Sequence, residues 1–125
     1  MSANQLRVVG AGLSFLLILL SGFWLSRSGK PYSGIILTIH KLISLAAVVL
    51  LGITIRRISQ AGALSTTELL AAIVTGLFFL GTMVTGGLLS IGKALPAIVL
   101  RLHQITPYLT VLSTAATMYL LRGKL

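Results

Sequence analysis

Cysteine is absent from this chain of 125 residues, and acidic residues are nearly absent, since Glu68 is the only one. Without cysteine, the protein has no disulfide, no thiolate-bound iron–sulfur cluster and no covalently attached haem. Glu68 stands three residues after Ser65, and Ser-x-x-Glu is the pattern of a capping box at a helix start. The single carboxylate therefore has a local structural explanation, and we do not expect it to be catalytic.

Charged residues are also scarce, at 9% of the chain, whereas 56% of the residues are hydrophobic. A soluble domain of this size has too little interior to bury so many apolar side chains. A bilayer core of about 30 Å needs about 20 apolar residues for each spanning helix. Four runs meet this requirement and predict one all-α integral membrane domain over residues 1–125, a bundle of four spanning helices. The runs cover roughly residues 8–25, 34–55, 67–91 and 97–121.

The formal net charge is +9, which raises the question of a nucleic-acid partner. The cations stand singly or in pairs near the ends of the apolar runs, and no aromatic-flanked basic surface accompanies them. This distribution is typical of side chains that anchor helices at anionic lipid headgroups. The sequence therefore predicts a lipid bilayer as partner and no nucleic acid.

An internal repeat relates the two halves of the chain. An offset of 63 residues superimposes His40 on His103 and Gly29-Lys30 on Gly92-Lys93, together with several aliphatic positions. The repeat covers about residues 13–57 and 76–120. It predicts two helical hairpins related by a pseudo-two-fold axis along the membrane normal.

The repeat places the only two histidines at equivalent points. Each lies about six residues after the expected start of its helix, so both imidazoles are expected roughly 9 Å below the same membrane interface. An axis between the second and fourth helices would turn the two rings toward each other. His40 and His103 are therefore the candidate ligands of a group held between them.

The residue inventory limits what that group can be. Zinc needs three or four protein ligands, and di-iron sites need carboxylates, which this chain does not supply. A haem brings four nitrogens of its own and needs only two axial ligands. The pattern predicts one non-covalent haem b with His40 and His103 as the axial pair.

Small residues accompany both histidines. Ser44 and Thr110 lie on the histidine-bearing faces of their helices, and Gly22 and Gly86 lie on the preceding helices near the ends that approach the histidines. These four residues are candidate haem contacts, because small side chains leave room for a macrocycle. Small and hydroxyl residues also line ordinary contacts between membrane helices, and that alternative stays open.

Two equivalent lysines, Lys30 and Lys93, are expected near the same interface as the histidines. Their ammonium groups are the first candidates to pair with the two haem propionates. When these two lysines are set aside, more of the other cations lie on the side of the chain termini than on the opposite side. This weakly favours termini on the cytoplasmic side under the positive-inside rule.

A family resemblance rests on the order of these features. Each half has Ser-Gly or Thr-Gly late in one helix, a short loop, and then a helix that begins near "IHKLISL" or "LHQITPYL". This order resembles the small multi-helix b-type cytochromes of bacterial respiratory membranes. The resemblance implies an inner-membrane electron-transfer protein, or a subunit of an oxidoreductase complex, that works with a quinone or a redox partner. Such proteins commonly carry more histidines and two haems, whereas this chain has ligands for one.

Two other functions remain open at the level of sequence. The chain is alternatively a haem-free structural or assembly subunit of a larger membrane complex, in which both histidines make hydrogen bonds near the interface. A small transporter is the third possibility. It is disfavoured because the apolar runs lack the intramembrane carboxylate that many proton-coupled relays use.

Overall fold

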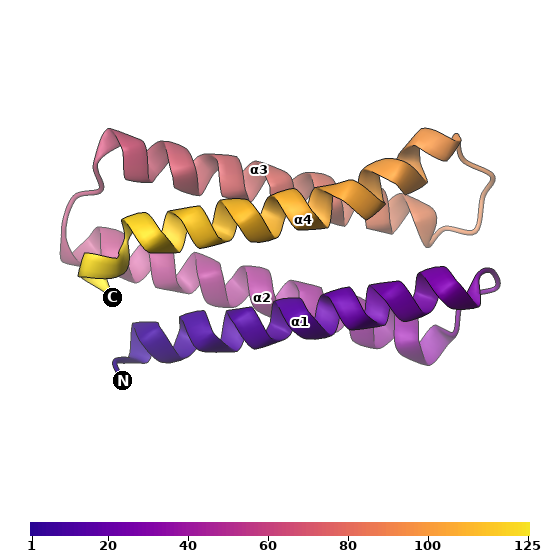
Figure 1. Cartoon of the computed structure of the whole chain (residues 1–125), viewed down its shortest axis with the longest axis horizontal. Helices are drawn as coiled ribbons and strands as arrows, with labels where there is room; N and C mark the ends of the chain where they lie inside the picture. The colour runs from indigo at the N-terminus through magenta and orange to yellow at the C-terminus, as the bar shows by residue number, and fades with distance from the viewer. The chain divides into compact units, whose positions relative to one another are not determined.

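A computed structural model describes all residues, 1–125, and shows an entirely helical chain (Figure 1). The chain divides into two compact units, Met1–Ala61 with Leu125 and Gly62–Lys124, and each unit is a helical hairpin. The first hairpin contains α1 and α2, and the second contains α3, α4 and a short terminal 3-10 helix, η1. Their bounds are α1 Ala3–Ser28, α2 Gly34–Ala61, α3 Thr66–Leu89, α4 Ala97–Leu120 and η1 Arg122–Lys124.

The predicted starts of the second and fourth helices are confirmed at Gly34 and Ala97. The first and second helices are longer than predicted, because the prediction followed the apolar runs while backbone hydrogen bonding continues into polar sequence. The third helix ends at Leu89, two residues before its predicted end, and the fourth ends at Leu120, one residue before its predicted end. The first helix begins earlier than expected because Ser2 and Gln5 form a capping box. The Ser2 hydroxyl accepts from the Gln5 N–H at 3.1 Å, and the Gln5 side chain accepts from the Ser2 N–H at 2.9 Å. The second helix likewise continues past the apolar run, to Ala61.

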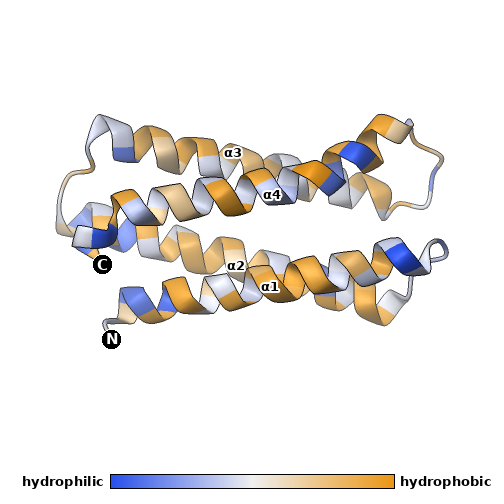
Figure 2. Ribbon diagram, in the orientation of Figure 1, coloured by the Kyte–Doolittle hydropathy of each residue, from blue (hydrophilic) through white to orange (hydrophobic).

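Three helices, α1, α2 and α3, are long and apolar enough to cross a membrane, and they identify an integral membrane protein. The helix α4 has 24 residues, about 36 Å at 1.5 Å per residue, so its length also suffices. Its composition is less apolar because Arg101, His103 and Gln104 lie in its first turns. Figure 2 shows this as hydrophilic colour within the N-terminal part of α4.

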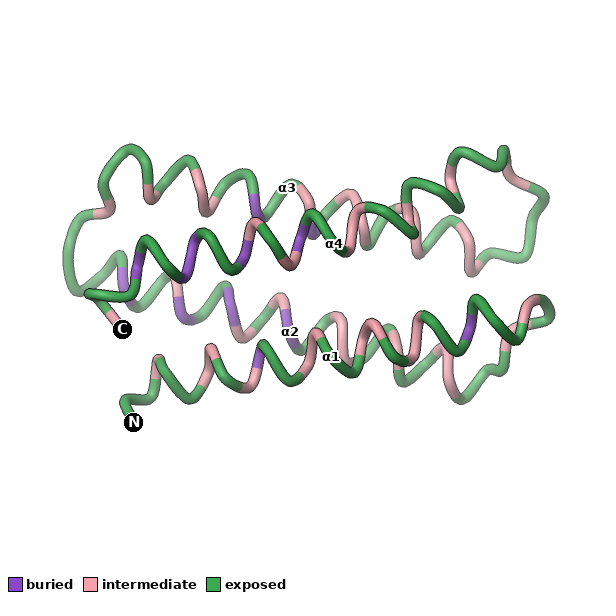
Figure 3. The backbone as a smooth tube through the Cα atoms, viewed as in Figure 1, coloured by how far each residue is buried: buried purple, intermediate pink, exposed green.

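The buried residues of each hairpin form a narrow stripe along its helices (Figure 3). In α2 the stripe consists of Ala47, Leu51, Thr54 and Ile58, which repeat every three or four residues and so share one helix face. Most large apolar side chains are exposed instead. Such a surface is unfavourable in water and suits contact with lipid chains.

The hairpin loops share a backbone feature. Gly29 after α1 and Gly92 after α3 have positive φ angles, of 68° and 81°. Glycine adopts this region without the steric cost that a Cβ atom imposes. Each glycine is followed directly by a lysine, Lys30 or Lys93.

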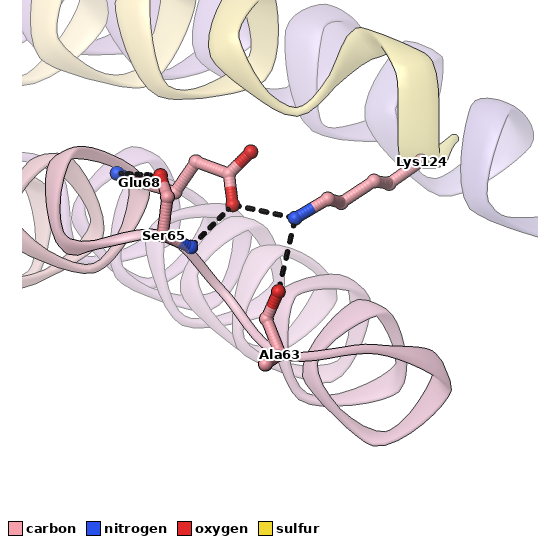
Figure 4. Close-up of polar contacts among 4 residues, drawn as sticks. All are labelled: Ala63, Ser65, Glu68 and Lys124. Carbon is pink, nitrogen blue, oxygen red and sulfur yellow. Dashed lines mark hydrogen bonds and ion pairs between the residues drawn. The ribbon is translucent and has the colours of Figure 1, made fainter.

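Glu68 has the structural role that its spacing predicts. The Ser65 hydroxyl accepts from the Glu68 N–H at 3.2 Å, and the Glu68 carboxylate accepts from the Ser65 N–H at 2.9 Å, which confirms the capping box. Lys124 of η1 adds an ion pair to the same carboxylate at 2.6 Å and donates to the Ala63 carbonyl at 3.2 Å (Figure 4). These contacts join the two chain ends of the second hairpin.

Candidate functional site

His40 and His103 occupy the same place in their hairpins. Each is six residues after the first residue of its helix, α2 or α4. Both side chains are half-buried. At 1.5 Å per residue, each lies about 9 Å along its helix from the loop end.

The His40 ring is held by the helix that precedes it. Its Nδ1 lies 2.8 Å from the Ser21 hydroxyl of α1. Ser21 also donates to the Ile18 carbonyl of its own helix, at 3.1 Å. The hydrogen bond links α1 to α2 and fixes the orientation of the imidazole.

The His103 ring is held in the corresponding way by α3. Its Nδ1 lies 3.1 Å from the Thr85 hydroxyl and 3.0 Å from the Thr82 carbonyl oxygen. Thr85 donates to two carbonyls of its own helix, those of Gly81 at 2.9 Å and Thr82 at 3.0 Å. In both hairpins, therefore, a hydroxyl one helix earlier engages the histidine through Nδ1.

A glycine follows each of these hydroxyl residues and lies against the imidazole. A Cβ atom at Gly22 would stand 3.1 Å from Cε1 of His40, and one at Gly86 would stand 2.7 Å from Cε1 of His103. Any larger residue would press on the ring, so glycine permits this close approach. The sequence predicts that the two glycines contact a haem. The structure places them beside the imidazoles, and their contact with a cofactor stays a prediction.

The other two predicted small contacts make hydrogen bonds within their own hairpins. Ser44 donates to the His40 carbonyl at 2.7 Å. Thr110 donates to the Thr106 carbonyl at 2.9 Å, lies 3.3 Å from the Thr82 hydroxyl and is only 2% exposed. Both lie one or two turns beyond a histidine, and their contact with a cofactor is a prediction that these bonds leave open.

The two predicted propionate partners are exposed loop residues. Lys30 lies near the aromatic ring of Tyr32, with its Nζ 6.0 Å from the ring centroid. Lys93 occupies the equivalent place in the second loop. Their ammonium groups are at the loop ends of the helices that carry the histidines.

A hydroxyl cluster between α3 and α4 adds polar contacts that the sequence analysis missed. The Thr75 hydroxyl lies 2.6 Å from Ser113 Oγ and 2.9 Å from Thr117 Oγ1. Thr75, Thr82 and Thr85 are spaced by seven residues and then three, which places them on one face of α3. This spacing is the feature of the sequence from which the cluster could have been predicted. The cluster thus links α3 to α4 within the second hairpin.

We expect the Thr75→Val substitution to lower the stability of the chain by about 1 kcal/mol, because it removes the hydroxyl that bonds to the half-buried Ser113 and the buried Thr117. Thr38→Val is the matched control, since the Thr38 hydroxyl is exposed and bonds to the Gly34 carbonyl of its own helix. Reversible unfolding in detergent, followed by circular dichroism, measures both. Equal stability of the two variants would contradict a role for the cluster in holding the hairpin.

Comparison with known proteins supplies no relative from which a function can be transferred. No protein family, curated protein or solved structure matches this chain. The structure also contains no group of three or more histidine, cysteine, aspartate or glutamate side chains that could hold a metal ion. The candidate groups are therefore the two imidazoles, His40 in the first hairpin and His103 in the second, each held within its own hairpin.

Proposed function

We propose that the chain is a membrane b-type cytochrome in which His40 and His103 bind one haem from opposite sides. One observation carries the proposal. Each hairpin presents one imidazole at the same distance from its loop, bonded at Nδ1 to the preceding helix and packed on a glycine. Metal-bound histidines characteristically have their second nitrogen held in this way.

The donor set fits haem by its chemistry. Two imidazoles complete the coordination of a porphyrin iron, because the porphyrin supplies the other four nitrogens. A metal ion without a porphyrin needs more protein ligands than two imidazoles provide. When bound, the haem supplies a one-electron iron couple. The chain's own residues orient the two rings, and the exposed loop residues Lys30 and Lys93 would neutralise the propionates.

The proposal includes an arrangement in the membrane. All four helices cross the bilayer as a bundle, the two hairpins are related by the repeat, and α2 and α4 run in the same direction. Arg101 snorkels from α4 to the headgroups. The termini face the cytoplasm of a bacterial cell, and a quinone or a redox protein exchanges electrons at the loop side.

Haem titration tests the proposed stoichiometry. Purified chain in detergent is expected to take up added haem with a sharp endpoint at one haem per chain, measured by absorbance and by pyridine haemochrome. An endpoint of two haems per chain would contradict a single site shared by the two hairpins. So would an endpoint of one haem for every two chains.

A haem-free structural subunit is the second candidate, and the same hydrogen bonds favour it. The contacts of His40 and His103 join α1 to α2 and α3 to α4, which is a sufficient structural role for an intramembrane histidine. This candidate predicts that the chain takes up no haem and that replacing either histidine destabilises its hairpin.

A further inference from the structure

The hydrogen bonds of His103 show which of its ring nitrogens carries the proton. A carbonyl oxygen can only accept, so the Thr82 carbonyl at 3.0 Å requires an N–H at Nδ1. The single hydroxyl proton of Thr85 is directed to the carbonyls of Gly81 and Thr82. Its oxygen therefore accepts from Nδ1 as well.

The same reasoning applies to His40. The Ser21 hydroxyl lies 3.1 Å from the Ile18 carbonyl oxygen, which can only accept, and 2.8 Å from Nδ1 of His40. A hydroxyl has one proton and two lone pairs, and both contacts are satisfied only if Nδ1 is the donor. The backbone of α1 thus sets the tautomer of a ring on α2 through one serine.

From these contacts we infer that Ser21 and Thr85, with the Thr82 carbonyl, are positioning groups that hold both histidines as the Nδ1–H tautomer. In a neutral imidazole this tautomer leaves the lone pair on Nε2. Each hairpin then offers the same nitrogen to a metal before any metal is bound. The tautomer itself stands on the hydrogen bonds alone, and its use for iron ligation rests on the proposed function.

Nitrogen-15 NMR of the full chain, labelled at histidine and free of haem, tests the tautomer directly. Spectra are recorded in alkaline buffer, where both imidazoles are neutral, and His40→Gln and His103→Gln assign the two rings. We expect a pyrrole-type Nδ1 and a pyridine-type Nε2 in both histidines. A pyridine-type Nδ1 in either ring would overturn the inference.

Substitution of the hydroxyls tests which groups impose the tautomer. Ser21→Ala is expected to lower the ratio of Nδ1–H to Nε2–H in His40 about tenfold, the effect of one hydrogen bond of ordinary strength. Thr85→Val is expected to change the tautomer ratio of His103 less, because the Thr82 carbonyl still accepts from Nδ1. Thr85→Ser keeps the hydroxyl and is expected to have the same ratio as the natural chain. Ser14→Ala is the control, since Ser14 lies on α1 and donates to Gly10 of its own helix.

An unchanged ratio in Ser21→Ala would remove Ser21 as a positioning residue. The NMR result is independent of haem uptake, so the two proposals fail separately. Nδ1–H rings in a chain that takes up no haem would support this inference and contradict the cytochrome. Haem uptake by a chain with Nε2–H rings in its free state would do the reverse.

Discussion

Replacement of His103 by alanine is expected to abolish six-coordinate haem binding and to lower the haem content of the purified chain at least tenfold. The substitution removes one of the two proposed axial nitrogens and leaves His40 as the only histidine of the chain. His40→Ala is expected to have the same effect, because the two rings have equivalent places in their hairpins. Haem content is measured by pyridine haemochrome and coordination by optical spectroscopy.

The matched control for His103→Ala is Gln104→Ala, which changes the next residue of α4, an exposed one. It is expected to retain the haem content and spectrum of the natural chain. A full complement of six-coordinate haem in either histidine variant would show that the axial pair is assigned wrongly. Equal loss in the Gln104 variant would show that the effect comes from general disruption of α4.

The Gly86→Ala substitution is expected to displace the His103 ring, although it adds only one methyl group. That methyl would stand 2.7 Å from Cε1, 3.3 Å from Nδ1 and 3.4 Å from Nε2 of the imidazole. Overpacking of this kind costs about 1–3 kcal/mol. Replacing glycine with alanine at an open helical position gains only about 1 kcal/mol, so the steric cost outweighs it.

Gly87→Ala is the control for this prediction, because a Cβ atom there meets nothing within 4 Å. We expect the Gly86 variant to be less stable than the Gly87 variant by about 1–3 kcal/mol in detergent unfolding, and to bind haem more weakly. Equal stability and equal haem affinity of the two variants would contradict the tight packing of the imidazole on α3.

Much of the fold follows from local sequence. Apolar runs predict the helices, the Ser65 and Glu68 pair predicts the start of α3, and the helix starts at Gly34 and Ala97 place the histidines as expected. These features depend on residues within one or two turns of each other. Local hydrogen bonding and helical spacing are sufficient to determine them.

The contacts around the histidines could not be predicted in the same way. The 63-residue offset that superimposes the histidines aligns Gly22 with Thr85, whereas the structure shows that Gly22 corresponds to Gly86 and Ser21 to Thr85. The second hairpin has one residue fewer between this pair and its histidine. A rigid offset therefore hides the equivalence, which depends on how each pair of helices packs.

The ion pair between Lys124 and Glu68 could not be predicted from local sequence either. Glu68 and Lys124 are 56 residues apart, and they meet because α3 and α4 are antiparallel and η1 turns the chain back toward Ala63. Sequence spacing identified the cap and gave no sign of its cationic partner.

A dithionite-reduced minus air-oxidised optical difference spectrum of the purified full chain distinguishes a haem protein from a haem-free subunit. We expect a sharp b-type spectrum of a six-coordinate haem, at one haem per chain, that does not change when carbon monoxide is added, because the two proposed imidazole ligands would fill the axial positions. A colourless chain that also fails to take up added haem would contradict the cytochrome proposal, and the structural-subunit function would then take its place.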